Sequence, residues 1–220
     1  MATWPTTGTK QQLEDNVFSV YAPLLKNISA WPASGNHEYE TNDATPFREA
    51  FVLPENGGEK GRERWYSFDY SSVHFVALDT EKVGDEQAAW LDADLASNDL
   101  PWTIVYFHRP PYSSGTHGSN MNVRSTFGPI LERHHVDLVL AGHDHDYERM
   151  KPQNGVNYVV SGGGGHDLRG VGQSDFTAFS DTVLHFVCVS VEPHQLVLHA
   201  IDATGREFDQ LVVSRELAAR

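Results

Sequence analysis

The sequence is poor in cysteine and in long apolar runs, and each shortage excludes a class of protein. Cys188 is the only cysteine, so an intrachain disulfide and a metal site built from thiolates are both excluded. Its place in the strand-like run HFVCVSV predicts a buried structural thiol. No run reaches the roughly 18 apolar residues of a membrane span, and residues 1–10 lack the apolar core of a secretory signal. We therefore expect no membrane segment and no signal peptide in this chain.

Basic residues are also scarce, with 16 Lys and Arg against 30 Asp and Glu, which gives a formal net charge of −14. This charge repels polyanions, so nucleic-acid binding is not expected. A small phosphorylated substrate remains compatible with it, because a bound metal ion can outweigh the overall field locally. The twelve histidines are the compositional exception, and the acidic balance indicates that they are not there for charge.

What is present is a chain of 220 residues with the composition of a globular protein. No internal repeat or low-complexity linker divides it, so we expect a single domain over residues 1–220. Strand, helix and strand in the middle and hairpins at the end predict a layered α/β sandwich with a partly mixed sheet. The periodicity predicts helices over 10–27, 85–99 and 123–135, a short strand and then a loop over 29–40, a hairpin over 64–80, strands over 103–107 and 136–142, and strands with turns from 156 onward.

Polar side chains of one chemical kind follow three of the predicted strands. Because the carboxyl ends of strands line the ligand crevice in layered α/β folds, we expect these side chains to converge. Imidazole nitrogens and an amide oxygen are neutral ligands that suit Zn, Mn or Fe, whereas magnesium or calcium would need mostly carboxylates. The residues are Asn36 and His37 in PASGNHEYE, His108 in YFHRPPY, and His143 and His145 in AGHDHDYER.

The spacing of His143 and His145 has two interpretations. In an extended stretch, residues i and i+2 point to one face, so each imidazole could bind one of two metal ions about 3.5–4 Å apart. Such a pair can equally be two solvated loop histidines, and Asn36 after a glycine is by itself a common turn residue. The agreement of all three segments favours the metal site. The glycines at 162–165 indicate a backbone that passes close to another group or turns tightly.

Three motifs resemble, in the same order, the last three metal-site motifs of the calcineurin-like metallophosphoesterases, and the tail Tyr-Glu-Arg is similar to the purple acid phosphatase branch. They are GNHE (35–38), HRPPY (108–112) and GHDHDYER (142–149). The resemblance implies the family's α/β/β/α sandwich with mixed sheets. It also implies that Asn36, His108 and His143 hold one divalent metal. His145 would be a ligand of a neighbouring ion, which is trivalent iron in the purple enzymes.

The same resemblance implies two catalytic residues. His37 would lie beside the phosphate and either stabilise the charged transition state or protonate the leaving alcohol. His117, in SSGTHGSN, falls where such enzymes place a further substrate histidine. The implied cofactors are one or two ions of Fe, Zn or Mn per chain, and the implied ligand is a small phosphate ester.

The chain departs from the family pattern before Asn36. The family also uses an aspartate motif near its first strand and a GDxxY-type motif after its second, but no Gly-Asp pair precedes Asn36, and Asp15 is the only aspartate there. The resemblance therefore implies a member that lacks the first strand–helix–strand portion and the carboxylate that bridges two metals. A single ion at Asn36, His108 and His143 is then favoured. The candidate substitutes for the bridging acid are Asp79, Asp144 and Asp146.

Two functions remain open at this point. The first is metal-dependent hydrolysis of phosphate esters, an acid phosphatase-like phosphomonoesterase reaction in which metal-activated water attacks phosphorus. The second is a non-catalytic remnant of the same fold that binds metal or phosphate, for which the missing aspartates are the evidence. An absent first portion would leave a sheet edge unpaired, which predicts a homodimer or aggregation along that edge. Members of this branch are often secreted, but the compartment of this chain stays open.

Overall fold

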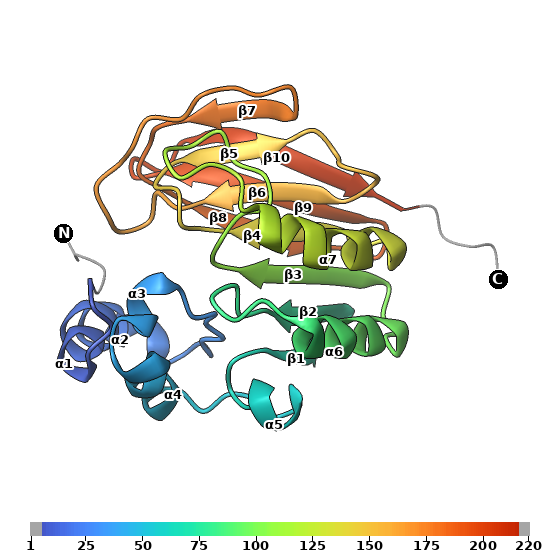
Figure 1. Ribbon diagram of the computed structural model, residues 1–220. Coiled ribbons are helices and arrows are strands. Elements are labelled where there is room, and N and C mark those ends of the chain that lie inside the picture. The colour runs from blue at the N-terminus through green and yellow to red at the C-terminus, as the bar shows by residue number, and fades with distance from the viewer. Residues whose placement is uncertain (1–5, 216–220) are drawn as a thin grey trace.

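The structure, a computed structural model, describes residues 6–215 and builds them around two β-sheets (Figure 1). A seven-stranded sheet has the order β1-β2-β3-β4-β6-β5-β7, and a three-stranded sheet has the order β10-β9-β8. The strands are β1 (Tyr66–Tyr70), β2 (Val73–Ala77), β3 (Trp102–Phe107), β4 (Leu138–Ala141), β5 (Tyr147–Met150), β6 (Asn157–Ser161), β7 (Thr177–Asp181), β8 (His185–Val191), β9 (Gln195–Asp202) and β10 (Glu207–Ser214).

The helices are mostly short. They are α1 (Lys10–Leu13), a π-helical turn η1 (Glu14–Phe18), α2 (Ser19–Leu25), α3 (Asn36–Tyr39), a 3-10 turn η2 (Asn42–Ala44), α4 (Thr45–Ala50), α5 (Gly58–Gly61), α6 (Asp85–Ala96) and α7 (Met121–Arg133). The first three run on from one another, as the periodicity of residues 10–27 predicts. Across residues 6–215, no helix has the length and apolar character that crossing a membrane requires.

The seven-stranded sheet separates two apolar layers. Strands β2, β3, β4 and β6 run parallel to one another, and β1, β5 and β7 pair antiparallel at either side. Helices α6 and α7 cover one face, where Val105 and Phe127 belong to one buried cluster (Figure 1). The three-stranded sheet packs on the opposite face, where Trp102, Leu138 and Leu198 belong to another. The predicted layered α/β sandwich with mixed sheets is confirmed.

The segment before α3 differs from its prediction, because residues 29–34 form no strand. Pro32 has no amide donor for a ladder, and side-chain contacts hold this segment against β1 instead. Trp31 stacks on Phe68 with the ring centroids 4.4 Å apart. Asn36 is consequently the first residue of a helix and not the residue after a strand.

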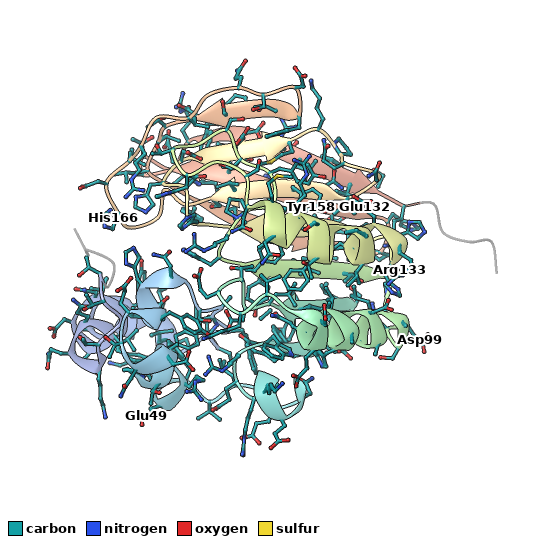
Figure 2. The ribbon with its side chains drawn as sticks, in the orientation of Figure 1. Glu49, Asp99, Glu132, Arg133, Tyr158 and His166 are labelled. Atoms are coloured by element: carbon teal, nitrogen blue, oxygen red, sulfur yellow. The ribbon has the colours of Figure 1, made fainter. Side chains whose placement is uncertain are left out.

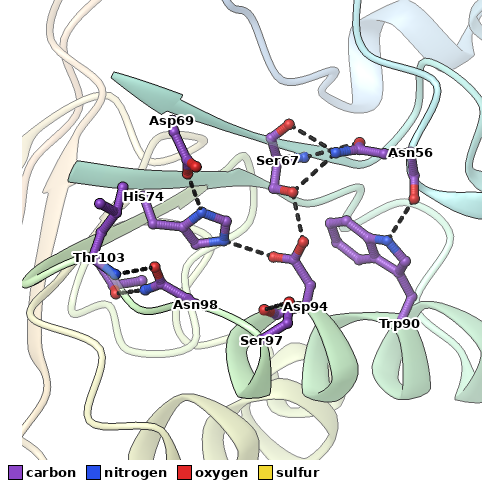
Figure 3. A network of polar contacts seen from close by, with 10 residues as sticks. Asn56, Ser67, Asp69, His74, Trp90, Asp94, Ser97, Asn98 and Thr103 are labelled. Carbon is purple, nitrogen blue, oxygen red and sulfur yellow. Dashed lines mark hydrogen bonds and ion pairs between the residues drawn. The ribbon is translucent and has the colours of Figure 1, made fainter. Parts of the chain in front are cut away.

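A polar network ties the hairpin of β1 and β2 to helix α6 (Figure 3). His74 Nδ1 lies 2.7 Å from Asp69 Oδ1, and His74 Nε2 lies 2.8 Å from Asp94 Oδ2. Ser67 Oγ donates to the other oxygen of Asp94 at 2.6 Å. Burial lowers the pKa of His74, but the hydrogen bonds and charges of the two carboxylates outweigh it and raise the pKa above its ordinary value. His74 therefore has a structural role, because it links the hairpin to helix α6.

Strand β8 alternates between a covered and an open face. Val187, Val189 and Val191 pack toward the seven-stranded sheet, whereas Phe186 is 56% exposed. Cys188 shares the side of Phe186 and is exposed, so the prediction of a buried thiol is wrong. The apolar run around Cys188 suggested burial on both faces, but only alternate residues of this strand meet the core.

Candidate active site

Three donor atoms from separate segments converge near the carboxyl ends of β3 and β4. Asn36 begins α3, His108 follows β3, and His143 comes shortly after β4. Asn36 Oδ1 lies 2.7 Å from His108 Nε2 and 3.1 Å from His143 Nδ1. The two ring nitrogens are 3.0 Å apart. Strands β3 and β4 are parallel neighbours, so the chain leaves both at one edge of the sheet, and this brings the histidines together.

Burial keeps both imidazoles of this triangle neutral at neutral pH. Desolvation, followed by repulsion from His143 and Arg109, lowers the pKa of His108 to about 3. Desolvation, followed by repulsion from Arg109 and His117, lowers the pKa of His143 to about 4. A neutral ring carries one unprotonated nitrogen, which can accept a hydrogen bond or bind a metal ion.

The paired histidines do not lie in an extended stretch, so that part of the interpretation is wrong. Strand β4 ends at Ala141, and His143 has a left-handed backbone with φ of 68°. The glycine run passes close to this turn, since a Cβ on Gly162 would lie 1.8 Å from the carbonyl oxygen of Asp144. The turn sends the two rings to different places: His143 joins the triangle, and His145 lies apart from it while lining the same cavity.

His145 is held by the loop that follows β6. Its Nδ1 donates to the carbonyl oxygen of Asp167 at 2.9 Å, and its ring centroid lies 4.5 Å from that of His166. Figure 2 labels His166 in this loop, on the side of the molecule where α3 lies. Burial is the main cause that lowers the pKa of His145. In the neutral ring, the donation from Nδ1 leaves the lone pair on Nε2.

A cavity of about 370 Å³ brings the predicted site residues together with two basic residues that were not predicted. His37 lines it and donates from Nδ1 to the carbonyl oxygen of Thr6 at 2.8 Å. The two further residues, His166 and Arg169, follow the glycine run. A glycine-rich backbone beside a site is the signal that could have found them, because it allows close approach. The titratable and amide side chains of the lining are Tyr21, Asn36, His37, Glu38, His108, His117, His143, His145, His166 and Arg169.

Arg169 is the one arginine or lysine in this lining. Its Nη1 donates to His117 Nε2, and its backbone N–H donates to the carbonyl oxygen of His145 at 3.0 Å. The His117 ring stacks on His143 with centroids 4.3 Å apart. The backbone N–H of His117 donates to Asp144 Oδ1 at 2.7 Å. The guanidinium is thus fixed next to the donor triangle and available to an anion.

The cavity lining has one carboxylate, that of Glu38. The three candidate substitutes for a bridging acid, Asp79, Asp144 and Asp146, are fully buried and line no part of the cavity. Within residues 6–215, no group of three or more His, Cys, Asp and Glu side chains could hold a metal ion. A metal site here therefore depends on the amide oxygen of Asn36 as the third donor. Two imidazoles and an amide form a neutral ligand set that fits ions of borderline hardness.

Comparison with known proteins agrees with this geometry. The model of the calcineurin-like phosphoesterase family matches residues 7–147, a range that includes Asn36, His108, His143 and His145. The chain belongs to this family. Purple acid phosphatase 21 of Arabidopsis thaliana is 34% identical, over 72% of this chain and 41% of its own length. The resemblance of the motifs to the purple acid phosphatase branch is confirmed.

Two further phosphoesterase-family relatives extend the comparison. The structure of a purple acid phosphatase from yellow lupin seeds superposes with a TM-score of 0.73 and 26% identity, covering 85% of this chain and 39% of that one. Probable inactive purple acid phosphatase 1 of Arabidopsis thaliana is 27% identical, over 92% of this chain and 40% of its own length. The chain spans between 28% and 41% of the length of eight curated relatives that it matches.

Proposed function

We propose that this chain hydrolyses phosphate monoesters in the cavity around Asn36, His108 and His143, with one metal ion held by these three residues. The observation that carries the proposal is the approach of their donor atoms to within 3.1 Å of one another. Neutral imidazoles and an amide oxygen are ligands that suit Zn, Mn or Fe. Such an ion, when bound, lowers the pKa of a coordinated water to near neutrality and polarises a phosphoryl oxygen.

A second ion would have only His145 from the predicted ligand set. Its Nε2 keeps a lone pair, but the described lining offers no carboxylate other than that of Glu38. The backbone N–H of Gly35 already donates to Glu38 Oε2 at 2.8 Å. Carboxylates also neutralise the charge of a metal pair, so we propose one ion per chain, with iron, zinc and manganese as the candidates.

The phosphoryl group would be bound by cationic and hydrogen-bonding side chains around the triangle. Arg169 is suited to this role, because a planar guanidinium can donate two parallel hydrogen bonds to phosphoryl oxygens. Its contact with His117 places a donor at Nε2 of that ring, so Nε2 is the unprotonated nitrogen. His117 would then position Arg169 and the phosphate and would not be the proton donor while this contact persists.

His37 is the better candidate to protonate the leaving alcohol. Its Nδ1–H is engaged by the carbonyl oxygen of Thr6, which can accept in both protonation states of the ring. The nitrogen left to face the leaving oxygen is therefore Nε2. General acid assistance of this kind contributes about 10²–10⁴-fold to a rate. The stated atoms give the proposal a distinct role for each of the two predicted catalytic histidines.

A second candidate function is a non-catalytic module that binds metal or phosphate. It is favoured by the absence of a bridging carboxylate from the described lining and by the similarity to a relative whose name is probable inactive purple acid phosphatase 1. The same residues would hold the ligands in this case, but no turnover would follow. Binding and hydrolysis therefore have to be measured separately.

The experiment combines metal content with hydrolysis of p-nitrophenyl phosphate. The purified chain is stripped with a chelator, reloaded with Zn, Mn or Fe, and assayed beside His108→Ala and the matched control His199→Ala. His199 bonds to Glu207 at 2.7 Å, outside the cavity. The enzymatic function is supported if turnover needs an added ion, is lost in His108→Ala and persists in His199→Ala. Metal binding without turnover for every ion supports the non-catalytic module.

A further inference from the structure

Three acidic side chains of the segment HDHDYE (143–148) are buried beside the candidate active site and line no part of its cavity. Asp144 and Asp146 belong to the turn between β4 and β5, and Glu148 belongs to β5. Each of the three residues is 0% exposed. Because a buried carboxylate is costly unless hydrogen bonds compensate it, the partners of these side chains indicate what the residues do.

The Asp144 carboxylate holds the loop that carries His117. Its Oδ1 accepts from the backbone N–H of His117 at 2.7 Å, and its Oδ2 accepts from the hydroxyl of Ser113. Hydrogen bonds to an ionised carboxylate are stronger than those between neutral groups. The loop between β3 and α7 is thus tied to the turn that contains His143 and His145.

Glu148 fixes the same loop at a second point. Its Oε2 accepts from the backbone N–H of Ser114 at 2.6 Å, and its Oε1 accepts from the hydroxyl of Thr177 on β7 at 2.5 Å. Figure 1 shows the loop from β3 to α7 reaching across to β5 and β7. The start of the loop is therefore held by Glu148, whereas the backbone at His117 is held by Asp144.

The position of the His117 ring decides where the guanidinium of Arg169 lies. The ring stacks on His143 with centroids 4.3 Å apart, and its Nε2 accepts from Nη1 of Arg169. The backbone N–H of Arg169 bonds to the carbonyl oxygen of His145 at 3.0 Å, which fixes the main chain but leaves a long side chain with many rotamers. The guanidinium thus depends on His117, and His117 depends on Asp144.

We propose that Asp144 is a positioning residue for phosphate binding: it holds His117 against His143, and through His117 it keeps the guanidinium of Arg169 next to the donor triangle. The inference rests on the proposed function, because it assigns the bound phosphoryl group to the same cavity. Asp144 does not line that cavity, so it acts through the two side chains and not by contact with the phosphate. Its loss should therefore change the affinity for phosphate and not the affinity for the metal.

Asp146 provides a matched control for this role. It is as buried as Asp144, but among residues 6–215 neither of its carboxylate oxygens has a hydrogen-bond partner. Its side chain lies against the same loop, since a Cβ on Gly115 would come within 2.5 Å of Asp146 Oδ2. Asp146→Ala therefore removes a buried carboxylate beside the loop without removing a bond to it.

The test measures the binding of inorganic phosphate to the chain saturated with zinc, by calorimetry. We expect Asp144→Ala to weaken phosphate binding by about tenfold or more, with unchanged zinc affinity. Asp144→Asn should retain most of the binding, because its amide oxygen can accept from the N–H of His117 and its amide N–H can donate to the hydroxyl of Ser113. Asp146→Ala should bind phosphate as the unaltered chain does.

Arg169→Ala separates a positioning role from a general loss of structure. If Asp144 acts through Arg169, adding Asp144→Ala to Arg169→Ala should weaken phosphate binding further by at most about twofold. A general structural effect of Asp144→Ala would be as large in this background as in the unaltered chain. The double variant therefore gives a result that instability alone does not produce.

Gly115→Ala tests the same contact from the loop if Asp144→Ala does not fold. Its Cβ would lie 2.6 Å from Asp144 Cγ, so the loop has to move away from the carboxylate and phosphate binding should weaken. Gly170→Ala is its control, because a Cβ there meets no atom within 4 Å. Neither glycine has a left-handed backbone, so alanine adds no backbone strain at either position.

The outcomes distinguish this inference from the proposed function. Equal phosphate binding by Asp144→Ala and Asp146→Ala, or an equal loss from Asp144→Ala with and without Arg169, would overturn the inference and leave the proposed function standing. Binding by Asp144→Asn as weak as that by Asp144→Ala would also overturn the inference. If the unaltered chain saturated with zinc binds no phosphate, the proposed function and the inference both fail.

Discussion

Gly35→Ala adds one methyl group beside the donor triangle without removing any donor. The backbone at Gly35 is extended, with φ of −119°, which alanine adopts without strain. A Cβ there would meet the His108 ring at 2.7 Å from Nδ1, 2.8 Å from Cγ and 2.9 Å from Cε1, well inside the 3.4 Å at which ordinary contact begins. His108 Nε2 would have to leave its place 2.7 Å from Asn36 Oδ1.

The size of the effect follows from how the ring responds. If the ring stays, overpacking costs about 1–3 kcal/mol of folding free energy. If it moves, a ligand is misoriented, and residues that orient ligands change metal affinity by about 10–100-fold when altered. We expect the second outcome, because the ring borders an open cavity and can shift into it. The assays are metal titration by calorimetry and hydrolysis of p-nitrophenyl phosphate, with urea unfolding as the check on stability.

Gly142→Ala is the matched control for this experiment. Its added methyl faces the same ring at 3.8 Å from His108 Nδ1, which is an ordinary contact. Metal affinity and turnover should therefore be close to those of the unaltered chain. A folded Gly35→Ala variant that binds metal and turns over as well as Gly142→Ala would refute the assignment of His108 to the metal.

Three further predictions concern the anion, the metal and pH. Arg169→Ala should raise KM for phosphate monoesters by about tenfold or more, with a smaller change in kcat. Arg169→Lys should recover only part of the lost substrate binding, because lysine lacks the planar guanidinium. A metal ion that binds the site, added at about 100 times its Kd, should raise the free energy of unfolding by about 2.7 kcal/mol. A chelator should reverse this increase. His74→Gln should destabilise the chain by about 1–3 kcal/mol at mildly acidic pH and by less at alkaline pH.

The sign of the last prediction follows from the raised pKa of His74 in the folded chain. The stabilisation is complete below the ordinary histidine pKa and is lost as the pH rises through the higher folded value. Asp94 should contribute most of this stabilisation, because the Asp69 side chain is 64% exposed and its ion pair with His74 is screened by solvent. Equal destabilisation by His74→Gln at both pH values would contradict this assignment. An unchanged KM in Arg169→Ala would contradict the prediction for the anion. A free energy of unfolding that stays the same when the chelator is added would contradict the prediction for the metal.

Much of the site could be predicted from the sequence, because it depends on where buried strands end. The β-branched and aromatic run before His108 and the apolar run before His143 both indicated strands, and their parallel pairing brings the two histidines to one edge. The left-handed turn at His143 could not be predicted, since it depends on the close passage of Gly162 over Asp144. Arg169 was missed for the same reason: a loop distant in sequence carries it into the cavity.

Outside the site, failures of the sequence-based predictions came from tertiary contacts that local patterns do not record. Residues 29–34 looked strand-like, but Trp31 stacks on Phe68 and the segment forms no ladder. Cys188 lay in an apolar run, yet the sandwich covers only the alternate residues of β8. In both cases the residue type was compatible with the prediction, and the arrangement of neighbouring layers decided otherwise.

Calorimetric titration of the chelator-treated chain with Zn, Mn and Fe, beside Asn36→Ala, tests the central claim most directly. The account predicts saturable binding of one ion per chain that is lost or strongly weakened in Asn36→Ala. Unchanged binding in that variant, or no binding of any of the three ions to the folded chain, would contradict it.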